Sequence, residues 1–215
     1  MNLYTKYNEL KTSLIHSENG NLNNKINSEK FRKIAKNLLI SPQKKPLRIS
    51  SVTLILYNKD HETQSLFIKR ATYSGYHSNQ YALPGGKMEK SDITTAQTAI
   101  RETHEELGIV MKPQEIIGQL DPIIIPISNY IVFPFVAFLE YAPEVKPDNI
   151  EVEKCYHYPI SELFSPDSEI QTEVNINNTL VEVSAYKIQN QIIWGATAIM
   201  LYDFKNRLKN IGKIL

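Results

Sequence analysis

Three glutamates crowd the last turns of one helix-forming segment, and this arrangement constrains the chain more than any other feature. Glu102, Glu105 and Glu106 stand at positions i, i+3 and i+4, so their carboxylates lie on one side of a helix. Like-charge pairs at this spacing destabilise a helix by about 0.2–0.5 kcal/mol each, and the helix macrodipole disfavours anions near the C-terminus. A hard divalent cation removes this penalty because Mg²⁺ prefers oxygen ligands. The alternative is a solvated acidic face, and the surrounding residues must decide between the two.

The helix is predicted between Asp92 and Leu107, and Gly108 ends it. Its apolar positions are expected to face the core, on the side opposite the glutamates. These positions are Ile93, Ala96, Ile100, Thr103 and Leu107. Gly85 and Gly86 precede the helix and allow the backbone to approach a metal or a phosphate closely, although a glycine pair is also common in turns.

The bulk properties predict a soluble globular domain without nucleic-acid or membrane partners. The chain has 215 residues, and its net charge of +1 gives no basic surface for a polyanion. The longest apolar run, Ile131–Leu139, is far shorter than the roughly 18 residues of a membrane-spanning helix. The single Cys155 excludes an intramolecular disulfide, and the N-terminus lacks the apolar core of a secretory signal. We therefore expect a cytoplasmic protein, and a homodimer is compatible with these features.

Strand-like segments outnumber helical ones along the chain. The predicted strands are Ile49–Tyr57, Gln64–Arg70, Tyr81–Leu83, Ile109–Met111, Ile116–Leu120, Tyr130–Glu140, Val152–Tyr158, Leu180–Ile188 and Gln191–Trp194. Further helices are predicted at Ser28–Leu39, just after Pro159 and at Ala196–Lys209. Because the order is mixed, the predicted class is α+β with a mixed sheet between helices. We divide the chain into an N-terminal helical extension, residues 1–45, and a main domain, residues 46–215.

The segment Gly85–Ile109 resembles the Nudix signature. Arg101–Ile109, with the sequence RETHEELGI, matches the second half of the signature, except that Thr103 replaces an aliphatic residue. The first half is one residue longer than in the general signature, and Asp92 stands where a glutamate is expected. This longer, aspartate-bearing version is similar to the coenzyme A pyrophosphatase branch of the Nudix hydrolases.

The flanking segments resemble the same branch. Its upstream motif is Lys-Arg, a gap, then Leu-Arg-any-His-any-Gly-Gln leading into Phe-Pro-Gly-Gly. Lys69-Arg70, His77 and Gln80 align with this motif, and Leu83–Gly86 aligns with its end, whereas Gly75 and Asn79 replace the motif's Arg and Gly. The segment Ile193–Ala198 resembles a C-terminal motif of the branch, so that the resemblance extends over about residues 49–208.

The resemblance implies a Nudix fold, which is an α/β/α sandwich with a mixed β-sheet, here with an N-terminal helical extension. It also implies hydrolysis of a diphosphate linkage with Mg²⁺ or Mn²⁺. The implied metal ligands are Glu102, Glu105, Glu106, the carbonyl of Gly86 and Glu151. For Glu151, an ordinary solvated side chain without a ligand role fits equally well. Either Glu102 or Glu105 would accept the proton of the attacking water, and Arg101 would orient a neighbouring carboxylate.

The same resemblance suggests substrate contacts from Lys69, Arg70, His77 and Gln80, although ordinary loop or strand-end roles fit them as well. The leading substrate is coenzyme A or acyl-coenzyme A, a small nucleoside diphosphate derivative. ADP-ribose, a dinucleotide or a modified nucleoside triphosphate is the alternative within enzymes, and a non-catalytic Nudix-fold nucleotide-binding module is the alternative outside them. We assign Trp194 to the core and Cys155 to a buried thiol rather than a nucleophile.

Overall fold

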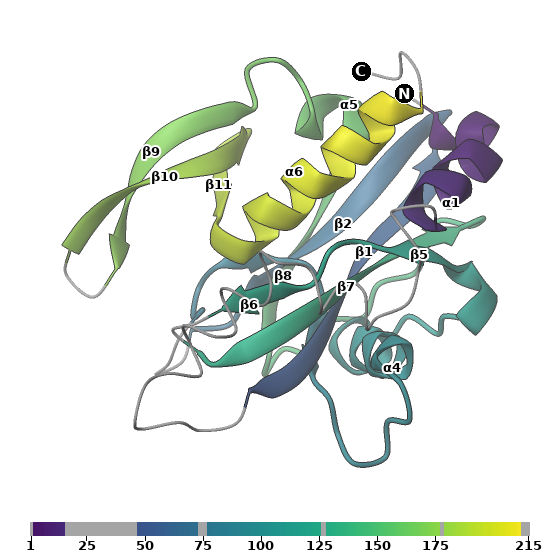
Figure 1. The fold of residues 1–215 in the computed structure, drawn as a ribbon, viewed down its shortest axis with the longest axis horizontal. Coiled ribbons are helices and arrows are strands. Elements are labelled where there is room, and N and C mark those ends of the chain that lie inside the picture. The colour runs from purple at the N-terminus through teal and green to yellow at the C-terminus, as the bar shows by residue number, and fades with distance from the viewer. Residues whose placement is uncertain (1, 16–46, 73–76, 126–127, 177–178, 212–215) are drawn as a thin grey trace.

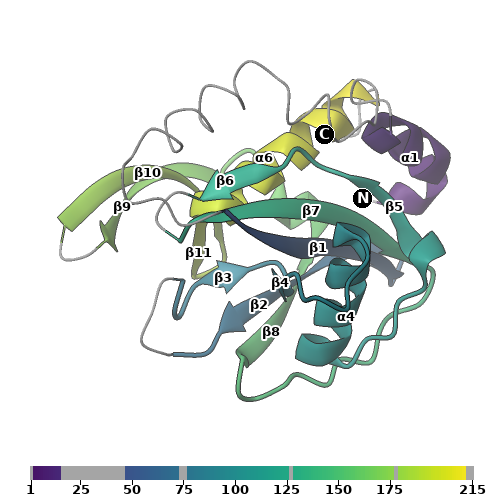
Figure 2. The same cartoon turned by 60° about the horizontal axis from the view of Figure 1, so that its bottom comes forward.

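The computed structural model describes residues 2–15, 47–72, 77–125, 128–176 and 179–211. Within these ranges the chain forms one large sheet, one small sheet and helices on both sides of the large sheet (Figures 1 and 2). The large sheet contains β1 (Arg48–Lys59), β2 (Glu62–Arg70), β3 (Tyr81–Ala82), β4 (Gly85–Lys87), β5 (Ile116–Gln119), β6 (Ile123–Ile125), β7 (Tyr130–Leu139) and β8 (Val152–Pro159). The small sheet contains β9 (Glu169–Ile176), β10 (Thr179–Ile188) and β11 (Gln191–Trp194). The α-helices are α1 (Tyr7–Ile15), α4 (Thr95–Leu107), α5 (Ile160–Leu163) and α6 (Gly195–Asn210).

The large sheet is mixed, as predicted, because β1 pairs with β7 in parallel and with β2 and β4 antiparallel. The parallel register runs from Arg48 opposite Tyr130 to Tyr57 opposite Leu139. Most residues in the middle of β1 and β7 are buried on both faces, which is typical of central strands covered by helices on each side.

Helices form a layer on each face of this sheet, which confirms the predicted Nudix-type α/β/α arrangement (Figure 2). On one face, Phe204 of α6 belongs to the same buried cluster as Leu54 and Phe138. On the other face, Ala99 of α4 packs with Phe133. The sheet is therefore the common wall of two apolar cores, and α4 is held firmly against it.

The helix α4 has well-defined ends. Thr94 accepts a hydrogen bond from the Gln97 amide and forms a capping box with that residue. Gly108, in the left-handed region at φ 69°, terminates the helix. The helix therefore begins three residues later than Asp92, its predicted start, because Thr94 provides the cap.

Several elements differ from the sequence prediction. The predicted strand Ile109–Met111 is wrong, since these residues follow α4 without joining a sheet, although both end residues are buried. The strands β4, β6 and β9 were not predicted because the first two are short and β9 is rich in polar residues. The hairpin between β10 and β11 is confirmed, with Ile188 opposite Gln191.

The N-terminal residues pack onto the domain. The sequence assigned no element to residues 1–15, but α1 and the 3-10 turn Leu3–Lys6 place Leu3, Leu10 and Leu14 in the core. The predicted helix Ser28–Leu39 lies outside the described residues, so the proposed division at residue 45 stays a prediction. None of the helices in the described ranges has the length and hydropathy needed to cross a membrane.

The contact between α1 and β5 gives a first testable prediction. A Cβ added at Gly118 of β5 would collide with the Leu14 side chain of α1. The substitution Gly118→Ala should therefore lower the free energy of unfolding by about 1–3 kcal/mol in urea titrations.

The matched control is the same substitution in a Leu14→Gly background, where the colliding side chain is gone and the cost should nearly vanish. An equal cost in both backgrounds would show that the Leu14 contact does not set the requirement for glycine.

Candidate active site

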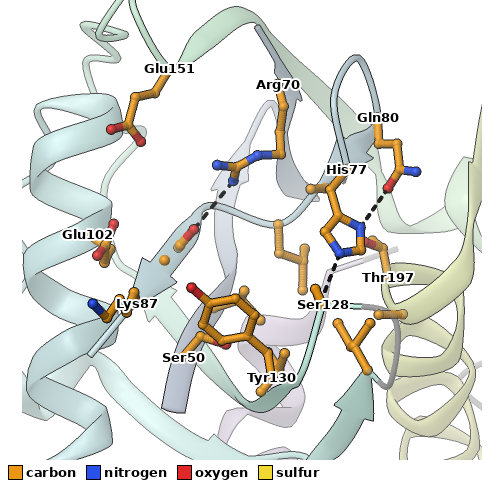
Figure 3. A pocket seen from close by; sticks show the side chains of 18 of the residues that line it. Ser50, Arg70, His77, Gln80, Lys87, Glu102, Ser128, Tyr130, Glu151 and Thr197 are labelled. Carbon is orange, nitrogen blue, oxygen red and sulfur yellow. Dashed lines mark hydrogen bonds between the residues drawn. The ribbon is translucent and has the colours of Figure 1, made fainter. Parts of the chain in front are cut away.

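A cavity of about 520 Å³ lies between α4 on one side and the start of α6 on the other (Figure 3). Of the residues predicted for the site, those that line the cavity are Arg70, His77, Gln80, Gly86, Arg101, Glu102, Glu105 and Glu151. The fold therefore brings together residues from four separate stretches of the chain.

The glutamates of α4 are placed differently from the sequence prediction. Glu102 and Glu106 are only 8% and 2% exposed, and they share the buried side of α4 with other residues of that helix. Glu105 alone is open to solvent, with a side chain 55% exposed, whereas Ile93, predicted to be apolar and inward, is 82% exposed. The predicted faces of the helix are therefore partly wrong, because a buried stripe at i and i+4 contains two carboxylates.

Glu106 is the most buried carboxylate, and two neighbours hold it. The backbone N–H of Gly85 donates to Glu106 Oε2 at 2.7 Å. Arg70 Nη1 lies 3.4 Å from Glu106 Oε1 and 3.5 Å from the carbonyl oxygen of Gly85. Glu106 thus connects α4 to β4 and to the end of β2.

Burial raises the pKa of Glu106 to about 7, although the charge of Arg70 and the Gly85 hydrogen bond act in the opposite direction. The negative charges of Glu102 and Glu151 add to this rise. Burial also raises the pKa of Glu102, against the effect of Arg101, and Glu105 and Glu151 again contribute. Four carboxylates are therefore close enough to repel one another, including Glu151 from the turn before β8.

Arg101 organises the exposed side of this cluster. Its guanidinium pairs with Glu102 at 3.0 Å and with Glu105 at 2.6 Å, so its predicted orienting contact is present. It also donates to both carboxylate oxygens of Asp92, at 3.1 and 2.9 Å, and to the carbonyl oxygen of Lys87. The Asp92 carboxylate in turn accepts from the Glu89 amide and the Thr98 hydroxyl, which fixes the segment between β4 and α4.

The donor set of this cluster fits a hard divalent cation. It consists of carboxylates that repel one another, and a Cβ at Gly86 would collide with the Glu102 carboxylate, so glycine keeps the backbone close to that group. In the described residues the acids contact arginines and do not converge as a ready group of three metal-binding side chains. Binding of a cation would therefore replace arginine contacts.

The opposite wall of the cavity carries neutral and basic groups. His77 Nδ1 lies 3.2 Å from Gln80 Oε1, and its Nε2 lies 3.3 Å from Ser128 Oγ (Figure 3). Arg48 stacks on the ring of Tyr130, with its Cζ 4.1 Å from the ring centroid. The sequence did not indicate Arg48, Ser128 and Tyr130, because only the parallel register of β1 and β7 places them beside the cavity.

Lys69, Glu106 and Trp194 depart from their predicted places, since Glu106, a predicted metal ligand, lies behind the cavity and does not line it. Lys69 does not line the cavity, and its ammonium group pairs with Glu153 at 2.6 Å. Trp194, assigned to the core, is only half-buried and lines the cavity. Burial raises the pKa of the half-buried Cys155 to about 11, so this thiol stays protonated near neutral pH and fits the predicted inert role.

Comparison with known proteins identifies the family. The model of the NUDIX domain matches residues 47–184, which include the whole cavity wall formed by α4 and β4. This chain belongs to the Nudix hydrolase family.

Related proteins and structures agree with this assignment. The chain is 30% identical over 162 residues to NudL, an uncharacterized Nudix hydrolase of Photorhabdus laumondii, covering 75% of this chain and 86% of that protein. It is 26% identical over 196 residues to a probable nudix hydrolase of Schizosaccharomyces pombe, covering 89% and 68% of the two chains. A MutT/nudix family protein from Enterococcus faecalis shares the fold, with a TM-score of 0.57 at 19% identity over 94% of this chain and 74% of that one.

The protein is therefore an enzyme of the Nudix pyrophosphatase type, and Nudix hydrolases generally require divalent metal ions. The binding-module alternative is set aside. In this Nudix hydrolase, β4 and α4 both lie within the matched domain.

The half-buried Asp92–Arg101 ion pair gives a pH-dependent prediction. Hydrogen bonding to Arg101 lowers the pKa of Asp92 to about 2 in the folded Nudix hydrolase, below its ordinary value near 3.9. The ionised carboxylate therefore stabilises the fold above about pH 4, and this contribution is lost as the pH falls toward 2. The substitution Asp92→Asn should cost about 2 kcal/mol at pH 7 and distinctly less at pH 3, measured by urea unfolding.

Asp60→Asn, in the exposed turn between β1 and β2, is the control and should change the unfolding free energy by less than about 0.5 kcal/mol at either pH. A cost for Asp92→Asn that is independent of pH would contradict the assigned ion pair.

Proposed function

We propose that this Nudix hydrolase cleaves the diphosphate linkage of coenzyme A or acyl-coenzyme A, with Mg²⁺ or Mn²⁺. The observation that supports this substrate is the position of His77 and Gln80. Both belong to the upstream motif of the coenzyme A pyrophosphatase branch, and both line the cavity opposite the carboxylates of α4. Arg70, from the same motif, lies between the two walls (Figure 3).

The residues in and behind the cavity have two proposed roles, binding the cation and activating the attacking water. Glu102, Glu105, Glu106, Glu151 and the Gly86 carbonyl would hold the cation, which supplies positive charge to the diphosphate oxygens when bound. Either Glu102 or Glu105 accepts the proton of the attacking water, since both line the cavity.

Two arginines complete this arrangement. Arg101 contacts both candidate bases and orients them. Arg70 lies 3.4 Å from Glu106 and lines the cavity, so its guanidinium would pair with a diphosphate bound there.

The carboxylates and Gly86 would act on the diphosphate only through the cation they hold, so they do not distinguish coenzyme A from ADP-ribose. Discrimination depends on the wall formed by His77, Gln80 and the start of α6. Buried polar groups in such a wall favour a substrate that satisfies them and penalise one that leaves them unpaired.

The metal-binding role predicts a loss of activity on conservative substitution. Glu106→Gln keeps the shape of the side chain but removes its charge, so kcat should fall by about 100-fold or more and the Mg²⁺ concentration for half-maximal activity should rise. The control Glu182→Gln, on an exposed position of β10, should leave both values unchanged.

Glu105→Gln should also reduce kcat, since Glu105 is both a candidate ligand and a candidate base. Wild-type turnover in both the Glu105 and Glu106 variants would refute the catalytic assignment.

The substrate proposal predicts an order of kcat/KM. Coenzyme A should exceed ADP-ribose and NADH when the three are assayed with the same Mg²⁺ concentration, and its products should be a phosphopantetheine and adenosine 3',5'-bisphosphate. Higher kcat/KM for ADP-ribose would assign the cavity to that substrate and reject coenzyme A.

A further inference from the structure

We infer that the cavity wall opposite α4 binds a second phosphoryl group of the substrate, separate from the diphosphate, and that Arg48 selects for it. This inference rests on the proposed function, because coenzyme A carries a 3'-phosphate on its ribose in addition to its diphosphate. It adds a specificity residue that lies outside both the Nudix signature and the upstream motif.

The two walls of the cavity differ in charge. Glu102 and Glu151 lie on the α4 side, together with the cationic Lys87 of β4 (Figure 3). His77 and Thr197 lie on the side of α6. A second phosphoryl group placed beside the carboxylates would be repelled by their charge, and a cation held there would already be neutralising the diphosphate. The extra group is therefore directed to the opposite wall.

Arg48 is the strong cation of that wall, and its geometry leaves donors available. Its Nη2 donates to the carbonyl oxygen of Ser128 at 2.7 Å, and its Cζ lies over the Tyr130 ring, 4.1 Å from the ring centroid. Among the described residues, one of the five N–H donors of this guanidinium has a hydrogen-bond acceptor. In the described part of the chain no carboxylate forms a salt bridge with Arg48, so its charge is not neutralised by a neighbouring acid.

Arg48 is an exposed residue, and its two contacts hold its guanidinium group against the cavity wall. Ser128 is buried, and its hydroxyl hydrogen-bonds His77 Nε2 while its carbonyl oxygen receives the Arg48 guanidinium. His77 in turn contacts Gln80 through its other ring nitrogen. Arg48 is thereby coupled to the two motif residues that support the coenzyme A assignment.

The start of α6 adds a weaker electrostatic contribution to the same wall. Ala196 and Thr197 line the cavity within the first turn of this 16-residue helix, and its N-cap residue Trp194 provides no side-chain hydrogen bond. Its first turn contains no acidic residue. The positive end of the helix dipole therefore faces the cavity without a local counter-charge.

The cavity is large enough for this arrangement. Its volume of about 520 Å³ lies within the range of about 300–1,000 Å³ that is typical of small-molecule sites. A nucleotide whose diphosphate lies at Glu102 can therefore extend toward Arg48 inside the same cavity.

The test compares coenzyme A with 3'-dephospho-coenzyme A, which differ only in the group that Arg48 is inferred to bind. The wild-type enzyme should show a kcat/KM about 10- to 100-fold higher for coenzyme A, because hydrogen bonds to charged groups contribute on this scale. Arg48→Gln should abolish that preference by lowering kcat/KM for coenzyme A alone.

Lys59→Gln is the matched control, since it removes one positive charge from the other end of β1, away from the cavity. It should leave the preference intact. Equal kcat/KM for the two substrates in the wild type, or an equal effect of Arg48→Gln on both, would overturn the inference while leaving hydrolysis of coenzyme A in place.

A binding measurement separates this inference from the proposed function. Calorimetric titration should show tighter binding of adenosine 3',5'-bisphosphate than of adenosine 5'-monophosphate, by about tenfold or more, and Arg48→Gln should remove the difference. This result would support the second phosphate site even if coenzyme A were a poor substrate. Equal affinities for the two nucleotides in the wild type would reject the site whatever the enzyme hydrolyses.

Discussion

The mutual repulsion of buried carboxylates on α4 is the physical constraint on which the site depends. Glu106 and Glu102 are both held inside the protein, and burial together with neighbouring negative charge raises the pKa of each. Desolvating carboxylates in this way is unfavourable unless positive charge or hydrogen bonds compensate. Arg70 and Arg101 provide that compensation in the present structure, and a divalent cation held by the same carboxylates would add to it.

The residues around these carboxylates form hydrogen bonds and ion pairs with them. Gly85 donates its N–H to Glu106 and adopts φ 145°, while β4 pairs with β1 so that this strand lies directly below the helix. The buried Asp92 carboxylate fixes Arg101, which then holds Glu102 and Glu105. Stability and chemistry are therefore coupled through a small set of hydrogen bonds, and the remainder of α4 packs as an ordinary core helix.

The sequence predicted the helix α4 and the long strands well because their signals are local. The spacing of Arg101 to Gly108 identified the helix, its end and its cluster of acids, and β-branched runs located the long strands. It misjudged which side of α4 is buried, since hydrophobicity alone assigns Glu102 and Glu106 to solvent. The N-terminal helix was missed because its core contacts, Leu10 and Leu14, are scattered among polar residues.

The cavity wall opposite α4 was beyond sequence analysis for a different reason. Arg48 and Tyr130 are far apart along the chain and meet only through the parallel pairing of β1 with β7. Trp194 is the last residue of β11 and the N-cap of α6. It lines the cavity because the hairpin of β10 and β11 places the start of α6 there. Pairing between strands that are distant along the chain has no short sequence signature. The residues of the wall opposite α4 can therefore be grouped only once the fold is known.

The most direct test of the account is a crystal structure of the enzyme grown with saturating Mn²⁺, with anomalous scattering used to locate the metal. We expect an anomalous peak beside α4, coordinated by Glu102, Glu105 and Glu106 side chains and close to the Gly86 carbonyl. A well-ordered structure in which these carboxylates keep their contacts with Arg70 and Arg101, without a peak between them, would contradict the account.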